Sequence, residues 1–123
     1  MKSTAEILKA AADDTRLTIL GLLFQHGELC VCDIEAVLRI TQSKASRHLR
    51  YLRNAGLVDD RRANVWVYYK IAKTQDAAVK AVLTSVKKIA AAAITGDIAL
   101  RLQKHLEQKN GGQDGCVRSQ LAK

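Results

Sequence analysis

The chain has 123 residues, of which 48% are hydrophobic and 26% charged, and it contains no proline. This length supports one domain with its own core, and the composition excludes a chain that is disordered throughout. Twenty Lys and Arg residues against 12 Asp and Glu give a net charge of +8, which favours a polyanionic partner, nucleic acid before an anionic membrane surface.

No basic segment followed by an apolar signal core opens the chain, and the longest apolar run, residues 89–94, is too short to cross a bilayer. We therefore expect a cytoplasmic protein without a membrane partner. Three cysteines at uneven spacing do not resemble a disulfide framework, and in a reducing compartment they indicate metal or redox chemistry.

The first part of the chain predicts three helices. The first covers residues 5–12, with Ser3 or Thr4 as its cap, and the Asp13–Thr15 segment separates it from the second. The second is apolar on most of its circumference and ends near Gly27, a plausible left-handed stop. A third helix opens near Cys30.

A fourth helix is predicted over about Gln42 to Ala55, with Thr41 as N-cap and Gly56 as its end. Its outward circumference carries basic and small hydroxyl residues, which suit phosphates and base edges in a major groove. A solvated basic face is the alternative, but a short helix, a turn and a basic helix follow one another as in a helix-turn-helix. The candidate DNA-binding residues on this helix are Gln42, Ser43, Lys44, Ser46, Arg47 and Arg50.

Two strands, Val58–Arg62 and Val65–Ile71, are predicted next, with Ala63-Asn64 at the hairpin tip because Asn tolerates positive φ. A hairpin after a recognition helix is typical of a wing, and Arg61 and Arg62 would reach DNA from it. A hairpin that only covers the core is the alternative. The fold class is thus mainly α with a small β-hairpin, a winged helix-turn-helix.

A long helix over residues 75–94 has an apolar stripe wider than a lone surface helix needs, with many small side chains. We expect it to form a symmetric homodimer together with the first helix, since paired recognition helices read a palindromic operator. A further amphipathic stretch runs to about Lys109. We expect residues 1–95 to be the DNA-binding and dimerisation domain, and residues 96–123 to be a C-terminal helix with a flexible, cysteine-bearing tail.

Over residues 11–71 the chain resembles the ArsR/SmtB family of winged-helix metal sensors. The resemblance is carried by Asp14-Thr15-Arg16-Leu17, Glu28-Leu29-Cys30-Val31-Cys32-Asp33, Gln42-Ser43-Lys44-Ala45-Ser46-Arg47-His48-Leu49, Ala55-Gly56-Leu57-Val58 and Trp66-Val67-Tyr68-Tyr69. It implies a repressor that binds double-stranded operator DNA and is released when arsenite or antimonite binds Cys30 and Cys32. It also implies that His48 contacts DNA.

The chemistry of the cysteines agrees with this resemblance. Trivalent arsenic and antimony are soft, prefer thiolates and accept three ligands, whereas zinc normally takes four. The helix N-terminus should lower the pKa of the paired thiols. Cys116 is the candidate third ligand, from its own chain or from its dimer mate, although a small thiol or hydroxide would serve as well. The inducer is As(III) or Sb(III), and no obligatory cofactor is expected.

A mechanism follows if both paired cysteines lie in a regular helix. Residues i and i+2 then point about 200° apart, so a shared ion would have to unwind the helix start beneath the recognition helix. Two other functions remain. A thiol-redox regulator would pair Cys30 or Cys32 with Cys116 on oxidation, while a thiol-dependent reductase is disfavoured because no Cys-x-x-Cys or Cys-x5-Arg spacing occurs. We do not expect this protein to be an enzyme.

Overall fold

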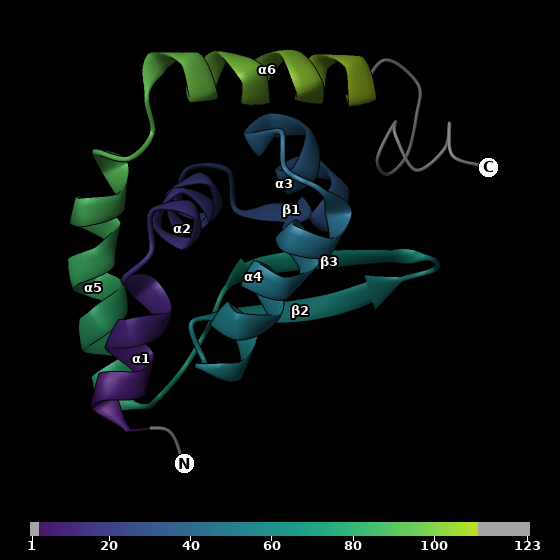
Figure 1. Cartoon of the computed structure of the whole chain (residues 1–123). Coiled ribbons are helices and arrows are strands. Elements are labelled where there is room, and N and C mark those ends of the chain that lie inside the picture. The colour runs from purple at the N-terminus through teal and green to yellow at the C-terminus, as the bar shows by residue number, and fades with distance from the viewer. Residues whose placement is uncertain (1–2, 111–123) are drawn as a thin grey trace.

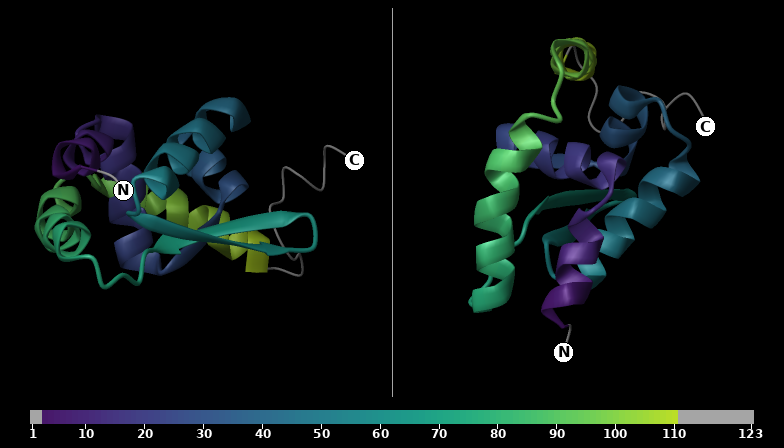
Figure 2. Two further views of the ribbon diagram at one scale, coloured as in Figure 1. Left: turned by 90° about the horizontal axis from the view of Figure 1, so that it is seen from below. Right: turned by 60° about the vertical axis from the view of Figure 1, so that its left-hand side comes forward.

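The structure is a computed structural model that describes residues 3–110. Its elements are α1 (Thr4–Ala11), α2 (Asp14–His26), β1 (Glu28–Cys30), α3 (Val31–Leu38), α4 (Gln42–Asn54), β2 (Val58–Ala63), β3 (Trp66–Ile71), α5 (Ala77–Ala91) and α6 (Gly96–Asn110). Helices α1 and α5 lie side by side at one flank, and the β2–β3 hairpin projects at the other (Figures 1 and 2).

The helices begin where local capping chemistry predicts. The side chain of Ser3 accepts a hydrogen bond from the Glu6 N–H at the start of α1, and Asp13 does the same for Arg16 at the start of α2. Thr41 caps α4, as predicted. Such oxygens satisfy backbone N–H groups that have no partner within the helix. The local sequence therefore fixes where the DNA-reading candidate, α4, begins.

Helix α2 lies at the centre of the core. Its buried side chains meet those of α4 and α5 in one apolar cluster that includes Leu20, Leu22, Leu49 and Val82. A Cβ at Gly21 would stand 2.9 Å from the carbonyl oxygen of Ala90, so the close approach of α2 to α5 requires glycine there. The dimer-helix candidates and the recognition-helix candidate are thus anchored to the same central helix.

The sheet has three strands in the order β1-β3-β2, all antiparallel. The predicted hairpin is confirmed, and Asn64 at its tip has a φ of 60°. The sequence prediction missed β1, because three residues are too few to show the alternation that marks a strand. Cys30, the last residue of β1, pairs with Tyr68 of β3, so the cysteine motif is part of the sheet.

Helix α6 is separate from α5 and crosses the molecule to pack against α3 (Figure 1). It contributes Leu102 to the same apolar core. Within residues 3–110, no helix is both long enough and apolar enough to span a membrane.

Candidate functional site

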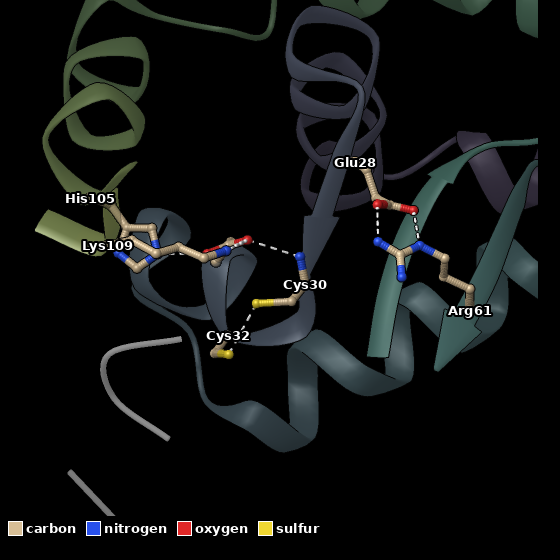
Figure 3. Close-up of polar contacts among 7 residues, drawn as sticks. Glu28, Cys30, Cys32, Arg61, His105 and Lys109 are labelled. Carbon is tan, nitrogen blue, oxygen red and sulfur yellow. Dashed lines mark hydrogen bonds and ion pairs between the residues drawn. The ribbon is translucent and has the colours of Figure 1, made fainter. Parts of the chain in front are cut away.

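The sulfurs of Cys30 and Cys32 lie 3.1 Å apart, and both residues are buried. Cys30 ends β1 and is the N-cap of α3, with extended backbone angles of φ −85° and ψ 167°, while Cys32 lies in the first turn of the helix. The change from extended to helical backbone between them turns the two side chains toward one another (Figure 3).

This geometry overturns the predicted unwinding mechanism. That mechanism assumed that both cysteines lie in a regular helix and point about 200° apart. Because Cys30 precedes α3, the sulfurs meet with the helix intact. Two thiolates at a bond length of about 2.3 Å, as for zinc, and a right angle at the ion would stand about 3.3 Å apart. The pair is therefore already spaced to hold one ion.

The prediction that the helix N-terminus lowers the thiol pKa is wrong for Cys30. The hydrogen bond with Cys32, burial and the nearby negative charge of Asp33 all raise the pKa of the Cys30 thiol. These effects exceed the favourable influence of the helix start. The pair is thus held as a buried, hydrogen-bonded dithiol.

Asp33 lies beside the pair and is fully buried. Its carboxylate accepts hydrogen bonds from the Cys30 N–H at 2.9 Å, from His105 Nε2 at 2.7 Å and from Lys109 Nζ at 3.0 Å. Burial alone would raise the pKa of Asp33, but the His105 and Cys30 hydrogen bonds and the Lys109 charge lower it to about 2. A charged carboxylate therefore joins the cysteine motif to α6 (Figure 3).

The sequence analysis missed this cluster. The predicted site residues included neither Asp33 nor His105, although the two lie 2.7 Å apart. One signal was available: an acidic side chain three residues after a helix cap often bonds back to the cap N–H, and Asp33 stands in that relation to Cys30. That spacing would have identified Cys30 as the cap.

A cavity of about 140 Å³ adjoins the cysteine pair. Gln42 and Ser46 of α4 and Trp66 of β3 line it together with Cys30 and Cys32. Trp66 and Tyr68 also pack directly against the cysteines. The candidate ligand site and the start of the candidate recognition helix therefore share one space.

Helix α4 presents its predicted polar residues as expected from its periodicity. Gln42, Ser43, Lys44, Arg47 and Arg50 are exposed and Ser46 is half-buried, while Ala45, Leu49 and Leu52 face the core. The exposed residues of α4 include four cations, with Arg53 beside the three predicted ones, and no acidic residue. This arrangement gives α4 a cationic outer face.

His48 is only half-buried on α4, and its Nδ1 lies 3.2 Å from Nη1 of Arg16. Burial, together with the positive charges of Arg16, Arg47 and Lys44, lowers the pKa of His48. Arg16 also stacks on Tyr51 and bonds to the carbonyl oxygens of Ala10 and Lys9. His48 thus forms part of the contact between α1, α2 and α4.

The two wing candidates, Arg61 and Arg62, are both exposed, and within residues 3–110 Arg61 is paired with Glu28. Its guanidinium donates two hydrogen bonds to Glu28 at 2.6 and 2.8 Å and lies over the Tyr68 ring. The bond with Arg61 lowers the pKa of Glu28. Arg62 follows it on β2, opposite Val67. Arg61 would therefore have to give up its hydrogen bonds to Glu28 before it contacted DNA.

The third metal candidate, Cys116, lies outside the described residues. Within residues 3–110, no three His, Cys, Asp or Glu side chains converge on a metal-sized site. The described part of the site thus provides two thiols.

Residues 13–60 match the family model described as bacterial regulatory protein, arsR family. The chain is 48% identical over 66 residues to the arsenical resistance operon repressor of Escherichia coli, covering 54% of this chain and 56% of that protein. It is 48% identical over 65 residues to the arsenic resistance transcriptional regulator ArsR1 of Pseudomonas putida, covering 53% and 51%. The chain thus spans about half the length of these relatives.

A solved structure extends the likeness. The homodimeric winged helix-turn-helix domain of a possible ArsR-family transcriptional regulator from Mycobacterium bovis is 36% identical, with a TM-score of 0.58 over 70% of this chain and 76% of that one. These matches confirm the predicted winged-helix fold and agree with a regulator rather than an enzyme. The chain belongs to the ArsR family of bacterial regulatory proteins.

Proposed function

We propose that this protein is a transcriptional repressor that binds operator DNA as a homodimer and is released when trivalent arsenic or antimony binds its cysteines. The observation that carries the proposal is the 3.1 Å separation of the Cys30 and Cys32 sulfurs. That separation is close to the spacing that one small ion requires of two thiolates. Two similar proteins are named as arsenic or arsenical resistance regulators.

Binding is a ligand exchange that leaves the oxidation state of arsenic unchanged. Arsenous acid carries three hydroxyl groups, and each As–S bond forms as one hydroxyl leaves with a thiol proton as water. Three thiols therefore release three waters. Cys30 and Cys32 would supply two bonds, and Cys116 is the candidate for the third.

DNA binding is supported by the outer face of α4. Lys44, Arg47 and Arg50 are exposed there, and cations on a recognition helix contact phosphates and guanine edges. Gln42, Ser43, Ser46 and His48 complete the proposed contact surface, with Arg61 and Arg62 reaching DNA from the hairpin. The hairpin projects on the side of the molecule away from α1 and α5 (Figure 2), so a second subunit on the α1–α5 flank would not cover it.

The flank formed by α1 and α5 suits a homodimer interface. Leu8 of α1 is 52% exposed and Ile89 of α5 is 57% exposed, so large apolar side chains of both helices reach the surface. The similar M. bovis domain is described as homodimeric. A twofold axis there would present two α4 helices to successive major grooves.

The shared cavity suggests how metalloid binding weakens DNA binding. An ion on Cys30 and Cys32 would occupy space that Gln42 and Ser46 also line, and would displace the first turn of α4 from its DNA-binding position. A coupling free energy of about 1 to 3 kcal/mol, or roughly 5- to 150-fold in affinity, is ordinary for such linkage. No unwinding of α3 is required.

Fluorescence anisotropy tests this function. Reduced protein is bound to a duplex selected from a random-sequence library and titrated with arsenite, antimonite, cadmium and zinc. Arsenite should weaken binding by at least about fivefold, and Cys30→Ser and Cys32→Ser should abolish that response. Unchanged DNA affinity at saturating arsenite would overturn the proposal.

A charge-matched pair of variants tests the DNA surface. Arg47→Ala should weaken DNA binding and lower the slope of log affinity against log salt by about 1, as expected for a lost phosphate contact. Lys104→Ala removes one exposed cation from α6 and serves as the control. Equal effects of the two variants would exclude Arg47 as a specific contact.

A thiol-redox regulator is the second candidate, favoured by the same short distance between the sulfurs. Oxidation would join Cys30 to Cys32, or either one to Cys116. Peroxide would then release DNA in the absence of arsenite, and dithiothreitol would restore binding. Release by peroxide but not by arsenite would favour this candidate over the metalloid sensor.

A further inference from the structure

A second cavity, of about 620 Å³, lies where α2, the end of β3 and one face of α5 meet. Each of these elements contributes one large apolar side chain to its floor, namely Phe24, Ile71 and Leu83. Small-molecule sites commonly have volumes of about 300 to 1,000 Å³ and apolar walls with a few polar groups. This cavity has that size and that kind of floor, and it shares no lining residue with the cavity beside the cysteines.

The rim of this cavity is cationic. Lys80 and Lys87 of α5 and Lys73 of the preceding linker line it, and within residues 3–110 its lining includes no acidic residue. All three lysines are exposed. In the described part of the chain, none of the three forms an ion pair with a carboxylate. An anion in the cavity would therefore meet positive charges that these residues do not neutralise.

Helix geometry places the two α5 lysines together and away from the proposed dimer flank. Positions 80 and 87 are two turns apart, so they lie on one face of α5, about 10 Å from each other along its axis. Ile89, the exposed apolar residue of the proposed dimer flank, is about 160 to 180° around the helix from both lysines. A second subunit on that flank would therefore leave the lysine face of α5 open.

Hydrogen bonds hold the linker, residues 72–76, which joins β3 to α5 (Figure 2). The Lys73 N–H donates to Asp59 of β2 at 3.2 Å, and the Asp76 N–H donates to Thr74 Oγ1 at 3.0 Å. Thr74 also lines the cavity. Because its oxygen accepts the bond from Asp76, the hydroxyl proton can be donated to a ligand. The cavity thus has a hydrogen-bond donor and a cation on a backbone that is already held in place.

We propose that this cavity binds a small amphipathic anion, with the apolar body of the ligand against Phe24, Ile71 and Leu83 and its acidic group at the lysine rim. An inorganic anion would leave the apolar floor uncovered, and an uncharged apolar molecule would leave the lysines without a counter-charge. The backbone of DNA has no apolar body to fill the floor. The inference goes beyond the proposed function, because the site includes neither the cysteines nor α4.

A titration with octanoate, followed by amide NMR of the reduced full chain, tests the site. Octanoate should cause saturable shifts in residues 71–75 and 80–87. Octylammonium carries a similar apolar chain with the opposite charge, and inorganic phosphate carries negative charge without an apolar body, so both should shift these amides far less. Equal shifts with either compound would overturn the proposal, as would a lack of saturable shifts at millimolar octanoate.

A charge-matched pair of double variants tests the rim. Lys80→Gln with Lys87→Gln should weaken octanoate binding by about fivefold, as expected for the loss of two exposed ion contacts. Lys88→Gln with Lys104→Gln removes two exposed cations that do not line the cavity and should leave binding unchanged. All four side chains are exposed, so both double variants should fold. Equal losses in the two would show a general effect of net charge and would overturn the proposal.

Two further measurements separate this site from the rest of the protein. Cys30→Ser with Cys32→Ser should bind octanoate as the parent does, whatever its response to arsenite, and a loss of octanoate binding would contradict an independent site. DNA is the alternative partner of the lysine rim. If Lys80→Gln with Lys87→Gln lowered the salt slope of DNA binding by about 2, the lysines would belong to the DNA surface and the anion site would be wrong.

Discussion

Two acidic residues flank the cysteine motif, and their surroundings differ sharply. Asp33 is fully buried and bonded to His105, Lys109 and a backbone N–H. Glu28 is paired with Arg61 at the edge of the sheet, where the arginine side chain is 53% exposed. Removing one partner of a buried ion pair leaves an unpaired charge that destabilises the fold, whereas water can replace the missing partner of an exposed pair. The Asp33 cluster should therefore govern folding, and the Glu28–Arg61 pair should be available to respond to DNA.

The largest expected effect comes from Asp33→Asn. It leaves the partly buried ammonium of Lys109 without its counter-charge, and breaking a buried pair typically costs about 3 kcal/mol. Urea unfolding should show a loss of that order in the free energy of unfolding, with Glu28→Gln as the control.

Adding Lys109→Met to Asp33→Asn should recover part of the loss, because the unpaired charge is then gone. A loss below about 1 kcal/mol for Asp33→Asn alone would mean that water reaches the cluster and that the contrast with Glu28 is wrong.

The next largest effect should be a difference between Asp33 and Glu28 in how each contributes to the pH dependence of stability. The pKa of Asp33 falls from its ordinary 3.8 to about 2 in the folded protein, which corresponds to about 2 kcal/mol of stability. Since the folded-state pKa is the lower one, this contribution is complete above about pH 4 and is lost as the pH falls toward 2. The difference in unfolding free energy between the parent and Asp33→Asn should narrow over that interval.

Acid titration of Glu28→Gln provides the comparison. Its unfolding curve should follow the parent's over the same pH interval, because the exposed pair contributes little to stability. A difference between parent and Asp33→Asn that stays constant from pH 5 to pH 2 would contradict the assignment of the charged carboxylate to Asp33.

A smaller effect is expected from salt, which should act on the exposed Glu28–Arg61 pair and leave the buried Asp33 cluster nearly unchanged. The screening length falls from about 10 Å at 0.1 M salt to about 3 Å at 1 M, and exposed charges are screened far more than buried ones. Raising NaCl over this range should leave the stability loss of Asp33→Asn nearly unchanged. Any difference between Glu28→Gln and the parent should vanish, and persistence of that difference at 1 M would place Glu28 among the buried charges.

The same contrast explains what the sequence could predict. The Thr41 cap, the extent of α4 and the positive φ of Asn64 depend on neighbouring residues, and all were predicted. The bond between Asp33 and His105 joins residues 72 positions apart, and nothing in the local pattern around either residue indicates it. Local chemistry therefore predicted the DNA-reading elements, while the support of the cysteine site required the tertiary structure.

The cysteine motif was predicted only in part. The residue types predicted a soft-ion site, but the backbone around Cys30 was assigned to a helix when it is the end of a strand. Periodicity cannot resolve a three-residue strand that runs directly into a helix. One misplaced boundary was enough to reverse the predicted directions of the two sulfurs and, with them, the mechanism.

The smallest expected effect concerns Arg61. Glu28→Gln removes the charge that holds its guanidinium on the sheet, so Arg61 becomes free to approach a phosphate. Stability should stay within experimental error of the parent, while DNA binding should strengthen and its salt slope should steepen by about 1. Adding Arg61→Ala to Glu28→Gln should cancel the gain, because Arg61 is the cation that is hydrogen-bonded to Glu28. If the gain survived in that double variant, it would reflect the change in net charge alone, and the hairpin would then be a cover for the core and not a second DNA contact.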